Sequence, residues 1–203
     1  MKALHVTLLI VFVCLAQQVE ISGGPVQSQN NEWLKYDDGT SNWLTWDGTY
    51  RGVWFNIEDF IPGANSWTVG TVETWFYHHS SYPWDTSEFL CEVWNGDASG
   101  PATLLGQVQS TAVHNSAVYT NFDPQLTTQG NFWCITNTEI SSGGWPSNLS
   151  DNMQGSVNHS FLSDDSVIWE PWEMFGGACN YFIRNTFDWE LAPCSWGSIK
   201  SVF

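Results

Sequence analysis

Alternation of side chains in residues 67–94 constrains the fold of this chain more than any other feature. Residues 69–76 form two alternating sets, Val69, Thr71, Glu73 and Trp75 in one and Gly70, Val72, Thr74 and Phe76 in the other. Residues 89–94 alternate in the same way, with Phe89, Cys91 and Val93 on one face and Leu90, Glu92 and Trp94 on the other. A period of two with β-branched and aromatic side chains is typical of strands, whose successive side chains point to opposite faces. The sequence therefore predicts two strands here.

The segment between these strands is typical of a turn. Residues 79–87 are mostly polar and carry Pro83 and Trp84 at their centre. Proline, serine and aspartate favour turns because they fix or cap the backbone locally. We expect the two strands to form a hairpin, to which the rest of the chain adds further strands.

Short strands are expected along most of the remaining chain. The ranges that favour strands are 33–36, 43–46, 52–57, 103–110, 117–122, 131–137, 157–163, 166–169 and 179–187. Residues 138–156 have no period and are expected to form a long loop. No segment has an amphipathic stripe of period 3.6 with helix caps. This pattern predicts an all-β fold, an antiparallel two-sheet β-sandwich of jelly-roll type.

The first residues have the features of a signal peptide. Lys2 precedes an apolar run that is too short to span a bilayer. We expect residues 1–16 to be removed after Ala16, with a cut near Gly23 as the alternative and lipid attachment at Cys14 as a rival interpretation. No second apolar run is long enough for a membrane span. The sequence thus predicts a protein that is secreted, extracellular or held at the cell surface.

The rest of the chain divides into three parts. Residues 17–32 are polar and without a period, so we expect a flexible leader. Residues 33–187 contain the predicted strands and form the β-sandwich domain. Residues 188–203 do not continue the strand pattern and are expected to form a separate C-terminal tail.

The charge of the chain excludes one class of partner. There are 21 acidic residues against five lysines and arginines, a net charge of −16. Such a surface repels phosphate backbones, so we expect no nucleic-acid partner. An acidic surface fits a secreted protein that must stay soluble, or one that binds divalent cations.

Four cysteines remain once the signal peptide is removed. An even number in an exported protein predicts two disulfides, although the sequence allows three pairings. We favour Cys91–Cys134, because both lie in predicted strands with similar surroundings, and Cys179–Cys194, which would attach the tail. None of the cysteines has the CxxC spacing of a structural zinc site.

Three short motifs follow one another along the domain. They are Tyr36-Asp37-Asp38-Gly39, then Val93-Trp94-Asn95-Gly96 leading to Gly100-Pro101 and Leu104, and finally Tyr181-Phe182-Ile183-Arg184. On these motifs the chain resembles a jelly-roll β-sandwich module of secreted and surface proteins of bacteria, over about residues 33–187. It departs from that module by lacking a glycine after Pro101 and by its many tryptophans. The resemblance implies a non-catalytic carbohydrate-binding or adhesion domain.

Tryptophan is the most distinctive residue of the chain, with 14 copies. Trp84, Trp145 and Trp172 lie beside prolines in predicted loops or turns, and Tyr82 lies close to Trp84. An aromatic ring exposed on a loop can stack on the C–H groups of a sugar, so we predict that these four residues bind the ligand. The alternative is that they fold back over the open ends of the sandwich. Other tryptophans, namely Trp54, Trp75, Trp94 and Trp133, lie in predicted strands and are expected to pack in the core or on a sheet face.

Acidic residues in turns suggest a calcium site. Asp37, Asp38 and Asp97 lie in glycine-containing turns, where carboxylates and carbonyls can supply the oxygen ligands that calcium prefers. The alternative is that these aspartates only stabilise turns, since no EF-hand register is present. No cofactor is expected to be required, and a structural calcium is the one cofactor for which the sequence offers candidate ligands.

The sequence contains no motif that predicts catalysis. There is no GxSxG elbow, and paired carboxylates mean little in a chain with 21 acids. Arg184 is expected to pair with a carboxylate, with ligand contact as the alternative. We therefore predict a secreted, non-catalytic protein that binds a glycan or other extracellular surface ligand. The alternatives are a structural or adhesive subunit that self-associates and, third, a secreted hydrolase.

Overall fold

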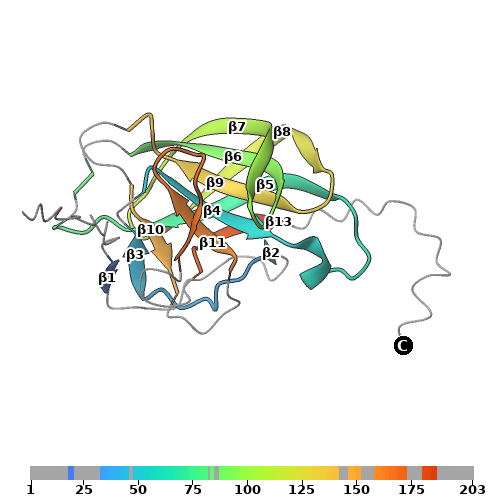
Figure 1. The fold of residues 1–203 in the computed structure, drawn as a ribbon. Coiled ribbons are helices and arrows are strands. Elements are labelled where there is room, and N and C mark those ends of the chain that lie inside the picture. The colour runs from blue at the N-terminus through green and yellow to red at the C-terminus, as the bar shows by residue number, and fades with distance from the viewer. Residues whose placement is uncertain are drawn as a thin grey trace, which may run out of the picture.

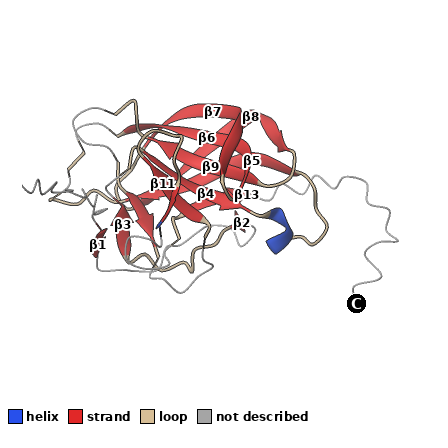
Figure 2. Ribbon diagram, in the orientation of Figure 1, coloured by secondary structure: helices blue, strands red, loops and turns tan. Residues whose placement is uncertain are grey.

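Strands make up most of the residues that the structure describes. The computed structural model describes residues 18–20, 33–45, 48–81, 83–84, 87–141, 146–151, 158–172 and 180–186. Figure 1 shows the strands of these residues layered over one another, and Figure 2 shows one short helix in the same part of the chain. That helix is a 3₁₀ turn, η1 (Ile57–Asp59). None of the described residues forms a helix that is long and apolar enough to cross a membrane. The predicted signal peptide, residues 1–16, and tail, residues 188–203, lie outside the described residues.

The first sheet is organised around one long strand, β5 (Trp67–Phe76). Its other strands are β1 (Gln18–Glu20), β2 (Trp33–Leu34), β3 (Trp43–Thr45), β8 (Ser116–Thr128), β10 (Asn148–Ser150) and β13 (Ile183–Thr186). The order is β1-β3-β10-β5-β13-β2, and β8 pairs with β5.

The second sheet has six strands in the order β12-β11-β4-β9-β6-β7. They are β4 (Tyr50–Phe55), β6 (Glu88–Asp97), β7 (Gly100–Thr111), β9 (Phe132–Asn137), β11 (Ser160–Ser163) and β12 (Glu170–Pro171). Every strand pair in both sheets is antiparallel. The predicted all-β, antiparallel two-sheet sandwich is therefore confirmed.

The main core lies between the two sheets. One buried cluster contains Val69, Val72 and Phe76 of β5 together with Phe89 and Val93 of β6. Val72 and Phe76 belong to one alternating set of β5, and Phe89 and Val93 belong to one face of β6, as the two-residue period predicts. Val69 belongs to the other set of β5, and it reaches the same core because the register shifts at a bulge between Val69 and Thr71. Burying an aliphatic or aromatic side chain of this size contributes about 1.5–3 kcal/mol, so this shared interior holds the two sheets together.

The predicted hairpin of residues 67–94 is wrong, because its two strands lie in different sheets. β5 pairs with β8 from Trp67↔Thr128 to Phe76↔Ser116, whereas β6 pairs with β7 and β9. The rings of Phe76 and Phe89 meet across the interior with centroids 4.8 Å apart. Each strand has an apolar face to bury, and the two faces cover each other better across the interior than side by side in one sheet.

Three other segments differ from the sequence prediction. β10 lies within residues 138–156, which were expected to form a loop, and β1 lies within the expected leader. Both pair with β3, and three residues are too few to show a period. Residues 166–169 do not form the expected strand, because Oδ1 of Asp165 accepts hydrogen bonds from the N–H groups of Val167 and Ile168 and holds a turn.

The expected disulfide between Cys91 and Cys134 is absent, and both are free, buried thiols. They do lie on adjacent strands, but Cys91 is opposite Thr136 and Cys134 is opposite Val93. The two cysteines are thus diagonal neighbours, a less direct arrangement than a facing pair. Burial raises the pKa of Cys91 to about 12 and also raises that of Cys134. Cys179 and Cys194 lie outside the described residues.

Arg184 confirms the prediction that it pairs with a carboxylate. Its Nε donates to Oδ2 of Asp37 at 2.8 Å, and its Nη1 donates to Oε1 of Glu73 at 2.8 Å. All three side chains of this ion cluster are buried. The cluster ties the chain after β2 to β5 and β13 of the first sheet.

Candidate functional site

Aromatic side chains collect on the outer face of the second sheet. In the register of this sheet Trp54 of β4 lies opposite Trp133 of β9, which lies opposite Trp94 of β6. The three therefore form one row across the strands, on the face opposite the core residues Val53 and Val93. Trp133 in the middle is buried, whereas its two neighbours are half-buried.

Trp169 lies over this face, where the sheet has room for its ring because one position carries no side chain. Gly52 of β4 has no side chain, and a Cβ built on it would lie 3.2 Å from the Trp169 ring. The Trp169 ring also lies 5.1 Å from that of Trp133 and 6.4 Å from that of Tyr50. Its loop is held by the turn around Asp165, and the Trp169 indole N–H donates to the Ser166 carbonyl at 3.2 Å. The ring is thus fixed by packing below and by hydrogen bonding beside it.

These rings border a hollow of about 360 Å³ on the outer face of the sheet, which we call the aromatic groove. Its aromatic residues are Tyr50, Trp94 and Trp169, and its polar residues include Glu92, Gln107, Asn137 and Glu139. They come from β4, β6, β7 and β9 and from the segments after β9 and before β12. The groove therefore combines aromatic rings with polar groups on a rigid sheet.

A chain of hydrogen bonds fixes the polar residues of the aromatic groove. Glu92 accepts from the Trp94 indole N–H at 2.8 Å and from the Asn137 side-chain amide at 2.7 Å. Oδ1 of Asn137 accepts from the Glu139 backbone N–H at 2.9 Å, and the Tyr50 hydroxyl donates to Glu139 at 2.9 Å. Burial, and next this hydrogen bond to Glu139, raise the pKa of Tyr50, so its hydroxyl stays protonated at neutral pH. The aromatic and polar groups are therefore oriented before any ligand arrives.

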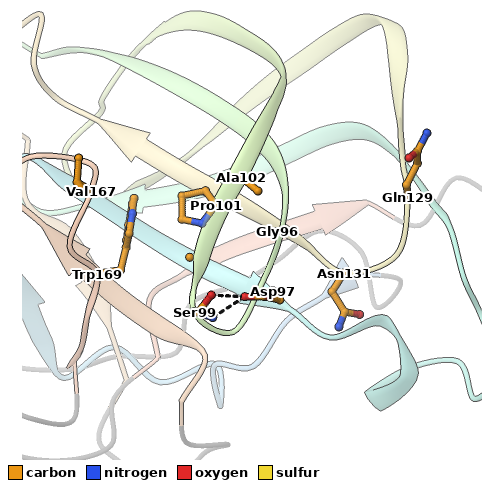
Figure 3. A pocket seen from close by; sticks show the side chains of 10 residues that line it. Gly96, Asp97, Ser99, Pro101, Ala102, Gln129, Asn131, Val167 and Trp169 are labelled. Atoms are coloured by element: carbon orange, nitrogen blue, oxygen red, sulfur yellow. Dashed lines mark hydrogen bonds between the residues drawn. The ribbon is translucent and has the colours of Figure 1, made fainter.

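A second hollow of about 520 Å³ adjoins the groove at the turn between β6 and β7, and we call it the hairpin hollow. It shares Pro101 and Trp169 with the aromatic groove. Figure 3 shows Trp169 on one side of the hairpin hollow, Gln129 on the other, and Pro101 between them. At the tip of the turn Oδ1 of Asp97 accepts hydrogen bonds from the hydroxyl of Ser99 and, at 2.8 Å, from its backbone N–H. The hydroxyl first, and the N–H next, lower the pKa of Asp97.

The loop aromatics predicted to bind the ligand do not form a common exposed platform. The prediction that Trp172 binds the ligand is wrong, because this residue is completely buried in the main core and packs against Tyr181 with ring centroids 5.7 Å apart. Trp84 is half-buried, with its ring edge-on to Phe76 at 6.3 Å, so it folds back over the core. Tyr82 and Trp145 lie outside the described residues.

The aspartates predicted to bind calcium are not brought together. Asp37 is buried and its carboxylate is engaged by Arg184, while Asp38 accepts from the Thr40 N–H at 2.7 Å. Asp97 lies in the other sheet and caps its own turn. Within the described ranges no three His, Cys, Asp or Glu residues are grouped so that they could hold a metal. The alternative interpretation, that these aspartates stabilise turns, fits all three, since each accepts a hydrogen bond from the backbone N–H two residues later, at Gly39, Thr40 and Ser99.

Sequence reasoning missed the aromatic groove, although one signal was present. Trp94 and Trp133 occupy the alternating positions that should face solvent when Val93 and Cys134 face the core. The outer face of an antiparallel sheet is normally polar, so tryptophans at these positions indicate a special surface. The part played by Trp169 depends on the gap at Gly52, which only the fold reveals.

The chain matches no protein-family model, no curated protein and no solved structure.

Proposed function

We propose that this protein is a non-catalytic carbohydrate-binding protein that holds its ligand in the aromatic groove. The observation that carries the proposal is the pairing of Trp94 and Trp169 with a hydrogen-bonded row of polar side chains in one hollow. Sugars present C–H groups on the faces of their rings and hydroxyls around their edges. An aromatic ring can stack against the C–H groups, and fixed amides and carboxylates can form hydrogen bonds with the hydroxyls.

The site we propose differs from the loop platform predicted from the sequence, but the ligand class is the same. The groove supplies both kinds of contact, and its members are held by strands and by hydrogen bonds to one another. Such pre-organisation lowers the entropy cost of binding. A secreted location, as the first residues of the sequence suggest, would expose the groove to extracellular glycans.

The test is binding to a panel of immobilised polysaccharides, by glycan array and by affinity electrophoresis. We expect the wild-type protein to be retained by at least one glycan. Trp94→Ala and Trp169→Ala should each weaken that binding about tenfold or more, as is usual when a central aromatic contact is removed. Because Trp169 packs on Trp133, its removal could also weaken the fold. The melting temperature of each variant, and the milder variant Trp169→Phe, show whether a loss of glycan binding comes from a loss of folding.

Trp84→Ala is the matched control, since it removes a half-buried tryptophan outside the groove. It should leave glycan affinity unchanged. Loss of binding in Trp84→Ala together with full binding in Trp94→Ala would place the site at the loop instead. If the wild type binds no glycan but its light scattering rises with concentration, the self-associating subunit is the better account.

Hydrolysis is the second candidate, because Glu92 and Glu139 both line the groove. Glycosidases use two carboxylates on either side of the bond that is cleaved. Against this function, both oxygens of Glu92 already accept hydrogen bonds from Trp94 and Asn137. A reducing-sugar assay on the glycans that bind separates the two functions, because release of sugar that is lost in Glu92→Gln and Glu139→Gln would show an enzyme.

A further inference from the structure

The aromatic groove and the hairpin hollow lie next to each other along the outer surface of the second sheet. Pro101 and Trp169 line both of them, so these two rings form the boundary. Beside that boundary Gly100 has no side chain, and a Cβ built there would lie 3.4 Å from the Trp169 ring. A ligand that passes over Pro101 and Trp169 would therefore touch both hollows.

Each hollow offers an exposed amide for hydrogen bonding. Gln107 lines the aromatic groove and Gln129 lines the hairpin hollow, and both are exposed. Within the part of the chain that the structure describes, neither side chain makes a hydrogen bond. An amide donates and accepts, as a sugar hydroxyl requires. The polar contacts thus continue past the boundary.

The charged groups of the two hollows are all acidic. Glu92 and Glu139 line the groove and Asp97 lines the hairpin hollow, whereas no lysine or arginine among the described residues lines either. Arg51 and Arg184 are 0% exposed, which leaves Lys35 as the exposed cation of the described ranges. Carboxylates and sulfates are recognised in proteins mainly by arginine and lysine. These hollows have neither.

We propose, building on the carbohydrate-binding function above, that the two hollows form one extended site for linear, uncharged glycan chains. Length follows from the shared boundary, since a chain in the aromatic groove continues over Trp169 into the hairpin hollow. Selectivity follows from charge, since a uronate or sulfated sugar would face Glu139 or Asp97 with no cation to offset the repulsion.

The experiment is isothermal titration with ladders of oligosaccharides from one to six sugar units. The neutral ladders are glucans, mannans, xylans and galactans, and the acidic ladder is oligogalacturonate. For the neutral ladder that binds, we expect affinity to rise about tenfold or more between short and long members. Gln129→Ala should remove that gain for long members and leave short members unchanged. The acidic ladder should bind at least about tenfold more weakly than the neutral ladder that binds.

Charge variants test the selectivity separately. Glu139→Gln and Asp97→Asn should reduce the difference in binding affinity between the acidic and neutral ladders. Added salt, which screens exposed charges, should do the same. Asp164→Asn removes an exposed charge that lines neither hollow and should leave this difference unchanged. Affinity that is already maximal for one or two sugars, or a preference for oligogalacturonate, would overturn this inference while leaving glycan binding intact. Failure of every ladder and polysaccharide to bind would instead overturn the proposed function itself.

Discussion

The buried ion cluster gives the sharpest prediction for the stability of this protein. One guanidinium, that of Arg184, faces two carboxylates, so the cluster carries a formal charge of −1. Glu73 also accepts from the Trp75 indole N–H at 2.7 Å, and Asp37 accepts from the Gly39 N–H at 3.1 Å. Burial lowers the pKa of Arg184, but Asp37 and Glu73 raise it by more, so the cation stays protonated. The perturbation we consider is Arg184→Met.

The expected cost follows from the charges left behind. Removing the cation leaves Asp37 and Glu73 buried as two like charges without the arginine that they share, and breaking a buried pair in this way costs about 3–5 kcal/mol. For a chain of this size each kcal/mol lowers the melting temperature by about 2–4 °C, so the expected drop is roughly 6–20 °C. Glu73→Gln should cost least, because it leaves Arg184 and Asp37 as a balanced pair. Asp37→Asn should fall between the two.

Urea unfolding and differential scanning calorimetry at neutral pH measure this order. A combined variant with Arg184→Met, Asp37→Leu and Glu73→Leu should recover much of the lost stability, because no buried charge remains in the cluster. The reasoning fails if Arg184→Met melts within about 2 °C of the wild type. So small a shift corresponds to a loss of about one kcal/mol or less in unfolding free energy, which would mean that water solvates the two carboxylates. It also fails if Glu73→Gln is the most damaging change. Glycan binding by the folded variants should not change, because the groove lies on the other sheet.

Three further predictions concern the groove, the thiols and one buried tyrosine. In Gly52→Ala the new Cβ would lie 3.1 Å from the Ile135 side chain and 3.2 Å from the rings of Trp133 and Trp169. Since Ile135 and Trp133 are buried and Trp169 is half-buried, the Trp169 ring should be the one that moves outward, and titration should show weaker glycan binding. Unchanged affinity would argue against a fixed ring. Cys91 and Cys134 should resist iodoacetamide at pH 8 in the native protein and react after unfolding without reductant, since burial raises both pKa values; peptide mass spectrometry would reveal a disulfide as a pair that never reacts. Burial, and next its hydrogen bond to Asp59, raise the pKa of Tyr36 above the ordinary value of 10.0, so the stability from this group is complete below pH 10 and is lost as pH rises. Melting curves from pH 9 to 11 should therefore fall less steeply for Tyr36→Phe than for the wild type.

The sequence predicted which residues form strands better than which strands pair. The alternation that includes Val72 and Phe76 on β5, and Phe89 and Val93 on β6, identifies one apolar face on each strand, and the structure buries both faces. The alternation contains no information on strand pairing, because β5 pairs with β8, about fifty residues away along the chain, and with β10 and β13, which lie farther away still. A short linker between two apolar strands therefore suggested a hairpin where the chain crosses from one sheet to the other.

The tryptophans show the same limit at the level of single residues. Trp169 and Trp172 are three residues apart and both lie near a proline, yet Trp172 is in the core and Trp169 borders the groove. Their difference depends on where β12 pairs with β11 and on the space above Gly52. Local composition could identify the aromatic residues, but the side on which each ring lies is decided by contacts that are distant in sequence.

The placement of the groove on strands, and not on loops, has a consequence for how it would bind. Trp94 is held by its hydrogen bond to Glu92, and Glu92 is held by Asn137 on the neighbouring strand. A ligand therefore meets side chains whose rotamers are already fixed, and little conformational entropy is lost on binding. The same arrangement makes the polar row vulnerable, because Glu92→Ala would leave the Trp94 indole N–H and the Asn137 amide without their acceptor. Glu92 should therefore matter for binding through the orientation of Trp94, in addition to any contact of its own with the sugar.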